Sequence, residues 1–189
     1  MELILREIIG ILIPQSRFIY KTILMTVFLS ITYLFFKDNG NKAWSKLIGV
    51  LKQPWYMLFF LCSAYLFTCT VMGRYFIKPY KAIFGSFGLF RDDGSINKDM
   101  FANIIMFIPY VFLYLKAFKP RRPFQSALIL SFGTTLFVEI SQLIGWLGNF
   151  QIADIMHNLF GGMIGYVVWC AWEKLVCTID HVSEWFSIQ

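Results

Sequence analysis

Four polar residues stand inside apolar stretches of this sequence, where a purely structural membrane helix would avoid them. Glu139 and Gln142 are three residues apart, and Asp154 and Asn158 are four apart, so each pair shares one face of a helix. A carboxylate in the bilayer interior costs about 2.5 kcal/mol or more on insertion scales, which makes it a functional-site candidate by default. Glu139 and Asp154 are therefore candidates for acid and base catalysis, and all four residues are candidates for binding a polar ligand.

Three further polar residues lie close to these pairs in the expected arrangement. Asn103 stands near the start of the preceding apolar stretch, His157 belongs to the last stretch, and Arg91 lies in a polar loop between two stretches. We expect Arg91 to offset Glu139 or Asp154, or to hold an anionic headgroup through paired hydrogen bonds. The other polar residues of that loop are Asp92, Asp93 and Asn97.

Each candidate also has a structural interpretation. Asp154 is a good helix N-cap, because its carboxylate accepts backbone N–H groups. Amides such as Gln142 and Asn158 form hydrogen bonds between membrane helices, worth about 0.6 to 2 kcal/mol. His157 fits a capping or packing role. Three glycines form a small-residue face that favours close helix packing: Gly161, Gly162 and Gly165.

Several familiar kinds of chemistry have no signature here. The sequence contains no GxSxG elbow, P-loop or HExxH helix, the common signatures of hydrolases, nucleotide-binding proteins and metalloproteases. No nucleophile is identified, so whether the protein is an enzyme stays open. Glu139, Asp154 and His157 lack the spacing of known metal sites, and we predict neither a metal nor a cofactor. The four cysteines form two pairs seven residues apart, which fits packing on a helix face.

The composition predicts the elements that must position these residues. The chain has 189 residues, of which 58% are hydrophobic and 15% charged, with a mean hydropathy of +0.62. Soluble domains average about 45 to 50% apolar and about a quarter charged residues, so the bilayer is the expected solvent. The net charge of +6 comes mostly from residues between apolar stretches, where it sets topology and meets anionic lipids. We predict no nucleic-acid partner.

The apolar stretches predict an all-α, multipass transmembrane helical bundle with about five spans. An interfacial helix is expected at residues 3–13, since this stretch is short and contains Arg6 and Glu7; no cleavable signal peptide is expected. Residues 78–90 are expected to lie on the membrane surface or dip into it. The whole chain, 1–189, is expected to be one integral membrane domain. The predicted spans are 18–36, 55–72, 101–118, 124–146 and 155–172.

Chain order alone predicts that the polar residues meet. Successive spans alternate in direction, so the start of the third, the end of the fourth and the start of the fifth lie at one side of the membrane. The sequence therefore predicts a polar pocket just below that surface. The short basic turn 116–122 is expected in the cytoplasm, because short loops rich in Lys and Arg orient best. The uncharged turn 147–153 and the pocket then face outward.

At these residues the sequence resembles the VanZ-like family of bacterial membrane proteins. The chain shows Glu139 and Gln142, eleven further residues, and then Asp154, Asn158 and a Gly–Gly pair at 161 and 162. This is similar to the family pattern E-x-x-Q … D-x-x-x-N-x-x-G-[GA]. Asn103, Phe107 and Pro109 are similar to its N-x-x-x-F-x-P element. The resemblance covers about residues 97–167. Where many members carry Arg or a second Asp in the turn, this chain has Asn149 and Gln151.

The resemblance implies a multipass protein of the bacterial cell membrane, in a family whose founding member is associated with resistance to the glycopeptide teicoplanin. The expected function is an accessory factor that lowers glycopeptide susceptibility. Its expected partners are membrane lipids and either the antibiotic or a lipid-linked cell-wall precursor; the oligomeric state stays open. The expected ligand-binding residues are Asn103, Glu139, Gln142, Asp154, Asn158 and Arg91.

Two other classes of function stay open from the sequence. One is a membrane enzyme acting on a lipid-linked phosphate or an envelope polymer, with Glu139 and Asp154 as acid and base and Arg91 orienting the phosphate. The other is a small transporter or flippase, since intramembrane carboxylates are common in such proteins. The sequence shows no clear inverted repeat, which is a feature of many transporter folds.

Overall fold

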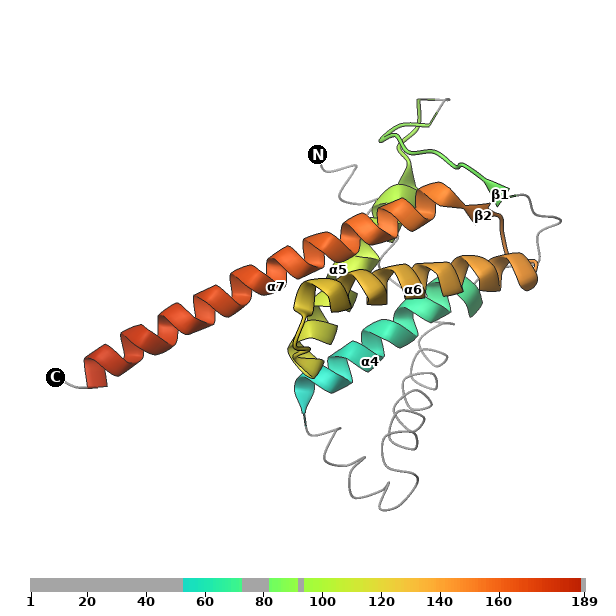
Figure 1. The fold of residues 1–189 in the computed structure, drawn as a ribbon. Coiled ribbons are helices and arrows are strands. Elements are labelled where there is room, and N and C mark those ends of the chain that lie inside the picture. The colour runs from blue at the N-terminus through green and yellow to red at the C-terminus, as the bar shows by residue number, and fades with distance from the viewer. Residues whose placement is uncertain (1–52, 73–81, 92–93, 188–189) are drawn as a thin grey trace, which may run out of the picture.

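A computed structural model describes residues 53–72, 82–91 and 94–187 of this chain. Within them, four helices are long and apolar enough to cross a membrane: Pro54–Val71, Lys98–Phe118, Pro123–Ile144 and Ile152–Ile179. The predicted helical multipass bundle is confirmed (Figure 1). The predicted interfacial helix and first span lie outside the described residues. The elements are α4 (Pro54–Phe67), the π-helix η1 (Thr68–Met72), β1 (Ala82–Ile83), α5 (Lys98–Phe118), α6 (Pro123–Ile144), β2 (Phe150–Gln151) and α7 (Ile152–Ser187).

Local sequence sets where the helices begin and end. Pro54 and Pro123 stand at the first turns of α4 and α6, where the missing N–H of proline costs nothing. Asn97 caps α5 by accepting a hydrogen bond from the Met100 backbone N–H at 3.2 Å. At the other end of α5, Lys119 adopts a left-handed conformation with φ 43°, which stops the helix and turns the chain toward α6.

Glycines allow α5 and α7 to pack closely. A Cβ atom on Gly161 would collide with the carbonyl oxygen of Ile104, and one on Gly165 with that of Ile108. Both contacts advance by four residues, so α5 and α7 run side by side in the same direction. Gly162 faces Ser131 of α6 instead. The small-residue face predicted from the sequence is therefore confirmed as a close helix contact.

The end of the bundle at the basic turn is packed by aromatic rings. Phe59 of α4 stacks on Tyr110 of α5 with ring centroids 5.4 Å apart. Lys116 Nζ lies 5.3 Å from the Trp55 ring and 5.8 Å from the Trp172 ring, and 2.8 Å from Glu173 Oε1. These contacts hold α4, α5 and α7 together at this end of the bundle.

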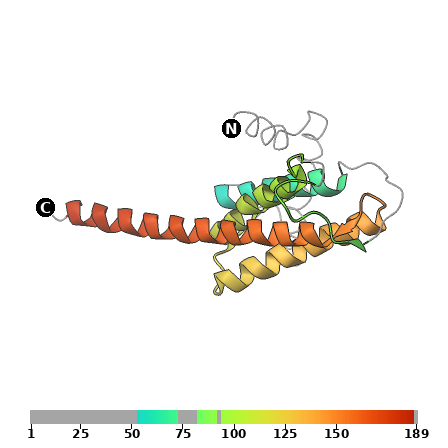
Figure 2. The same cartoon turned by 90° about the horizontal axis from the view of Figure 1, so that it is seen from above.

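Helix α7 differs from its predicted bounds of 155–172. It begins at Ile152 and continues to Ser187, and Figures 1 and 2 show its C-terminal half extending beyond the other described helices. A helix can continue past an apolar stretch through charged residues such as Glu173 and Lys174, because their long side chains reach water. Asp154 lies inside the first turn of α7 and is therefore not at the N-cap position that its structural interpretation gave it.

A short strand pairing joins the two loops at the other end. β1 and β2 pair in parallel, with Ala82 opposite Phe150 and Ile83 opposite Gln151. One more hydrogen bond extends this contact, because the Ala153 backbone N–H donates to the Phe84 carbonyl at 2.8 Å. The sequence did not predict this pairing. It fixes the loop before α5 against the first residues of α7.

Candidate functional site: a polar cleft at one end of the bundle

The polar residues do gather at one end of the bundle, as chain order predicted. Glu139 and Gln142 lie on the last turns of α6, Asp154 and Asn158 on the first turns of α7, and Asn103 near the start of α5. All five are buried; Glu139 is 1% exposed and Asp154 6%. Their position is thus as expected, while their role in binding a ligand stays a prediction.

Glu139 supports the turn between α6 and α7. Its Oε2 atom accepts a hydrogen bond of 2.8 Å from the backbone N–H of Gln151, the residue of β2 that lies opposite Ile83 of β1. This hydrogen bond holds Gln151, and with it the strand pairing, in place.

The two amides connect helices. Gln142 Nε2 donates to the Thr70 carbonyl oxygen of η1 at 3.0 Å, and Asn158 Nδ2 donates to Thr135 Oγ1 of α6 at 2.7 Å. Both amides therefore form hydrogen bonds between helices, as their structural interpretation predicted. The oxygens Gln142 Oε1 and Asn158 Oδ1 are buried without a hydrogen-bond partner in the described part of the chain.

A cleft of about 310 Å³ opens beside these buried polar residues. Its wall comes from three places: the loop before α5, the first turn of α5, and the β2–α7 junction. Two of the predicted ligand-binding residues, Arg91 and Asp154, line it. Glu139, Gln142, Asn103 and Asn158 are not among its lining residues. The lining residues are Ile83, Gly85, Ser86, Arg91, Asn97, Asp99, Gln151 and Asp154.

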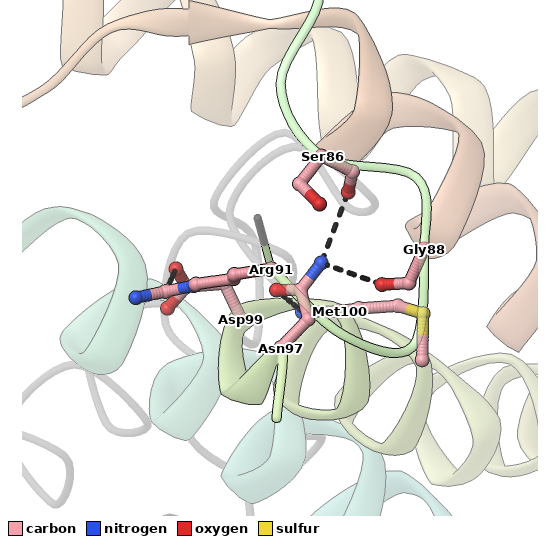
Figure 3. Close-up of polar contacts among 6 residues, drawn as sticks. All are labelled: Ser86, Gly88, Arg91, Asn97, Asp99 and Met100. Carbon is pink, nitrogen blue, oxygen red and sulfur yellow. Dashed lines mark hydrogen bonds and ion pairs between the residues drawn. The ribbon is translucent and has the colours of Figure 1, made fainter. Parts of the chain in front are cut away.

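We call residues 83–91 and 94–97 the cleft loop. Asn97 fixes its path, because its Nδ2 atom donates to the carbonyls of Ser86 and Gly88, both at 3.0 Å (Figure 3). Gly85 has φ +74°, and a Cβ atom there would lie 2.8 Å from Gln151 Oε1 and 2.9 Å from Ala153 Cβ. Only glycine adopts this conformation freely and leaves this space. The cleft loop thus lies directly against the start of α7.

Arg91 has a different partner from the one the sequence suggested. Its Nη2 atom lies 2.6 Å from Asp99 Oδ2 in an exposed ion pair (Figure 3). Both Arg91 and Asp154 nevertheless line the cleft. A ligand there therefore meets a guanidinium group and two carboxylates together.

Sequence reasoning missed three polar lining residues: Ser86, Asp99 and Gln151. Asp99 offered one signal, since an acid two residues after a helix N-cap is common, but nothing local paired it with Arg91. His157 lies beside the cleft loop, with its ring 6.2 Å from that of Phe87. Among the described residues, no three His, Cys, Asp or Glu side chains group as metal ligands would.

Comparison with known proteins assigns the family. A family model described as VanZ/LLP1 matches residues 18–173, a range that contains both sequence motifs, the cleft and most of the described helices. No curated protein and no solved structure gives a significant match. Since the family model covers far more than half of the 189 residues, the chain belongs to the VanZ/LLP1 family of membrane proteins.

Proposed function

We propose that this protein is an accessory factor of the bacterial cell membrane that lowers susceptibility to glycopeptide antibiotics such as teicoplanin by binding a lipid-borne envelope component. The observation that supports this proposal is the polar cleft between the cleft loop and the start of α7. Its wall combines a guanidinium group, two carboxylates, two amides and a hydroxyl group. Such a mixture of donors and acceptors can orient a polar ligand.

The size of the cleft favours a lipid headgroup over the drug itself. Sites for drug-sized ligands span about 300 to 1,000 Å³, and the cleft, at about 310 Å³, is at the lower limit. The body of a glycopeptide is far larger than this volume. A headgroup fits inside, while its hydrocarbon chain stays in the membrane.

The expected topology places the cleft where the antibiotic acts. The basic turn 116–122 lies at the opposite end of the bundle from the cleft. If that turn is cytoplasmic, as its charge predicts, the cleft opens at the outer surface. There it can take up a component of the envelope on which a glycopeptide acts.

A susceptibility profile tests this function. A deletion strain should become more susceptible to teicoplanin, and a restored strain should recover. Asp154→Asn should fail to restore resistance, because it removes a cleft charge with little change of volume. Glu173→Gln, which removes a carboxylate at the opposite end of the bundle, is the matched control and should restore it. A deletion strain with unchanged susceptibility would contradict the proposal.

One observation keeps an enzyme as the second candidate. Arg91 and Asp154 line the same cleft, so a phosphate held by the guanidinium group would lie near a carboxyl group able to transfer a proton. Purified protein incubated with envelope lipids across a range of pH and metals should then yield a changed lipid by mass spectrometry. An unchanged lipid profile leaves the binding function as the better account.

A further inference from the structure

Helix α7 is longer than the membrane that it crosses. Its apolar span, Ile152–Ile179, has 28 residues, which cover about 42 Å at about 1.5 Å per residue, whereas the hydrocarbon core of a bilayer is about 30 Å thick. The 21 and 22 residues of α5 and α6 match that thickness. The ion pair of Lys116 with Glu173 brings the last turn of α5 to the level of Glu173. The residues of α7 that follow Glu173 therefore emerge from the bundle at the basic turn.

One face of this half of α7 is apolar. Six large apolar residues follow one another at alternating steps of four and three residues, which places them on one side of a helix. The helix continues to Ser187, so its backbone includes all six. The members whose side chains the structure describes, as far as Ile179, are each at least 40% exposed. We call the six residues the α7 seam: Val168, Trp172, Leu175, Ile179, Val182 and Phe186.

The charged residues of this half of α7 lie on other faces of the helix. At 3.6 residues per turn, each falls roughly 120° or more from the centre of the seam. An apolar face that leaves the bilayer meets water, and an exposed apolar surface of this kind marks a contact with another molecule. The charged or titratable residues are Glu173, Lys174, Asp180, His181 and Glu184.

The spacing of the seam identifies another helix as its partner. Alternating steps of three and four residues are the a and d pattern of a coiled coil, in which two helices pack along their apolar seams. A helix that binds a membrane surface must lie in the plane of that surface. Helix α7 instead continues without a break from the span, and its C-terminal half projects past the other described helices (Figures 1 and 2).

The residues beside the seam are compatible with a second copy of the same helix. In a coiled coil the e and g positions flank the seam, and their charges select the partner. None of these positions between residues 171 and 185 is charged, so two identical helices meet there without repulsion. Two copies in one membrane also share one orientation, so their α7 helices leave the same side and run parallel. The flanking residues are Ala171, Val176, Thr178, Ser183 and Trp185.

We propose that the α7 seam joins two copies of this chain through a parallel coiled coil that extends beyond the basic turn. This inference goes beyond the proposed function and does not depend on it. Trp172 marks the membrane end of the coiled coil, because its ring also packs within the bundle, 6.4 Å from Trp55 and 6.1 Å from Phe112. The pairing places the clefts of both copies at the same surface of the membrane.

Disulfide cross-linking of the full-length protein in the membranes of expressing cells tests the pairing. In a variant whose four cysteines are replaced by serine, Leu175→Cys and Ile179→Cys each add one cysteine to the seam. The matched control keeps only Cys177, which is exposed and lies on the opposite side of the helix. Under a mild oxidant, the two seam cysteines should give a disulfide-linked dimer on a non-reducing gel, because equivalent a or d residues of a parallel pair face each other. The control should stay monomeric. Absence of the dimer at both seam positions, or equal dimer in the control, would overturn the inference.

Charge substitutions test the same contact by native mass spectrometry in detergent. The original chain should be a dimer. Ile179→Lys and Ile179→Glu each place like charges opposite each other in a pair of identical chains, so each variant alone should be monomeric. Expressed together with different tags, the two variants should form a mixed dimer, which also shows that both are folded. Lys174→Glu, on another face of the helix, should remain a dimer. A monomeric original chain, a dimer in every variant or a missing mixed dimer would each contradict the pairing.

Other occupants of the seam give distinct results. If another segment of the same chain covers it, the protein is a monomer in which a cysteine at position 175 is protected from a water-soluble maleimide. If the membrane surface covers it, the protein is a monomer in which quenchers attached to lipid chains quench a fluorescent label at position 175. Either result would refute the coiled coil.

Discussion

At the scale of single residues, burial gives Glu139 and Asp154 different roles. Glu139 is enclosed and accepts the Gln151 backbone N–H, whereas Asp154 is buried but contributes to the cleft wall. Glu139 would act on a ligand only indirectly, because it holds the backbone of the cleft wall at Gln151. Asp154 is therefore the stronger candidate for direct contact with the ligand, and Glu139 is a positioning residue.

The supporting role of Glu139 predicts that two substitutions at this position differ in their effect on stability. In Glu139→Gln the side-chain oxygen can still accept from Gln151, so the protein should express and melt close to the original. Glu139→Ala leaves that N–H group unpaired and should lower the free energy of unfolding by about 1 to 3 kcal/mol. Thermal melts in detergent, read by size-exclusion chromatography, measure both. Equal losses in the two variants would show that the negative charge itself is required for folding.

Asn158 should contribute modestly through its bond to Thr135. Such pairs in membrane proteins average about 0.6 kcal/mol, with a maximum of about 1.7. A double-mutant cycle with Asn158→Ala and Thr135→Val should give a coupling energy in this range from reversible unfolding in mixed micelles. A coupling near zero would indicate that the 2.7 Å contact adds no stability. Loss of lipid binding without loss of stability would instead assign Asn158 to the ligand site.

At the scale of elements, the contact between α5 and α7 decides the geometry of the cleft. Both helices begin at the cleft, at Lys98 and Ile152, and their close approach at Gly161 and Gly165 fixes how far apart their first turns lie. Small residues at such contacts allow backbones to approach and gain van der Waals packing. A change in this contact should therefore move Asp99 and Asp154 relative to each other.

Gly161→Ala tests the contact. Its Cβ atom would meet the Ile104 backbone, which cannot move aside as a side chain can, so a cost of about 1 to 3 kcal/mol is expected for overpacking. Gly133→Ala on α6 is the matched control, because among the described residues no atom beyond its own helix backbone and chain neighbours lies within 4 Å of its Cβ position. Thermal melts should show a lower midpoint for Gly161→Ala and an unchanged or higher one for Gly133→Ala. An unchanged midpoint for Gly161→Ala would contradict the close packing.

At the scale of the whole molecule, the two ends of the bundle differ in chemistry. One end carries the cleft and the buried carboxylates. The other carries the basic turn, the aromatic cluster and the pair of Lys116 with Glu173. From its charge we expect the basic turn in the cytoplasm, and this orientation would direct the cleft to the outer leaflet.

Cysteine labelling tests this orientation. In a variant whose four cysteines are replaced by serine, a single cysteine at Ser95 should react with a membrane-impermeant maleimide added to intact cells, and one at Arg121 should react only after the cells are opened. Ser95 lies beside the cleft and Arg121 in the basic turn. The reverse labelling pattern would place the cleft in the cytoplasm and remove its access to an extracellular drug.

The amino-acid sequence determined the bundle, the order of its helices and the end at which the polar residues gather. These features depend on the length of apolar stretches and on the alternation of spans, which are local or follow from chain order. The sequence also identified Glu139, Gln142 and Asn158 as buried polar residues, but not whether each contacts a ligand or another helix. Only Asp154 and Arg91, of the six predicted ligand-binding residues, line the cleft.

The tertiary structure decided the rest. Three features depend on the path of an irregular segment. They are the pairing of Arg91 with Asp99, the bond from Gln151 to Glu139, and the position of the cleft loop against the start of α7. That path is set by bonds from Asn97 within the loop and by contacts with residues more than sixty positions away, such as Phe84 with Ala153. The periodicity of apolar residues in the sequence does not predict such contacts. Each contact forms only after the helices have brought its two chain segments to the right distance.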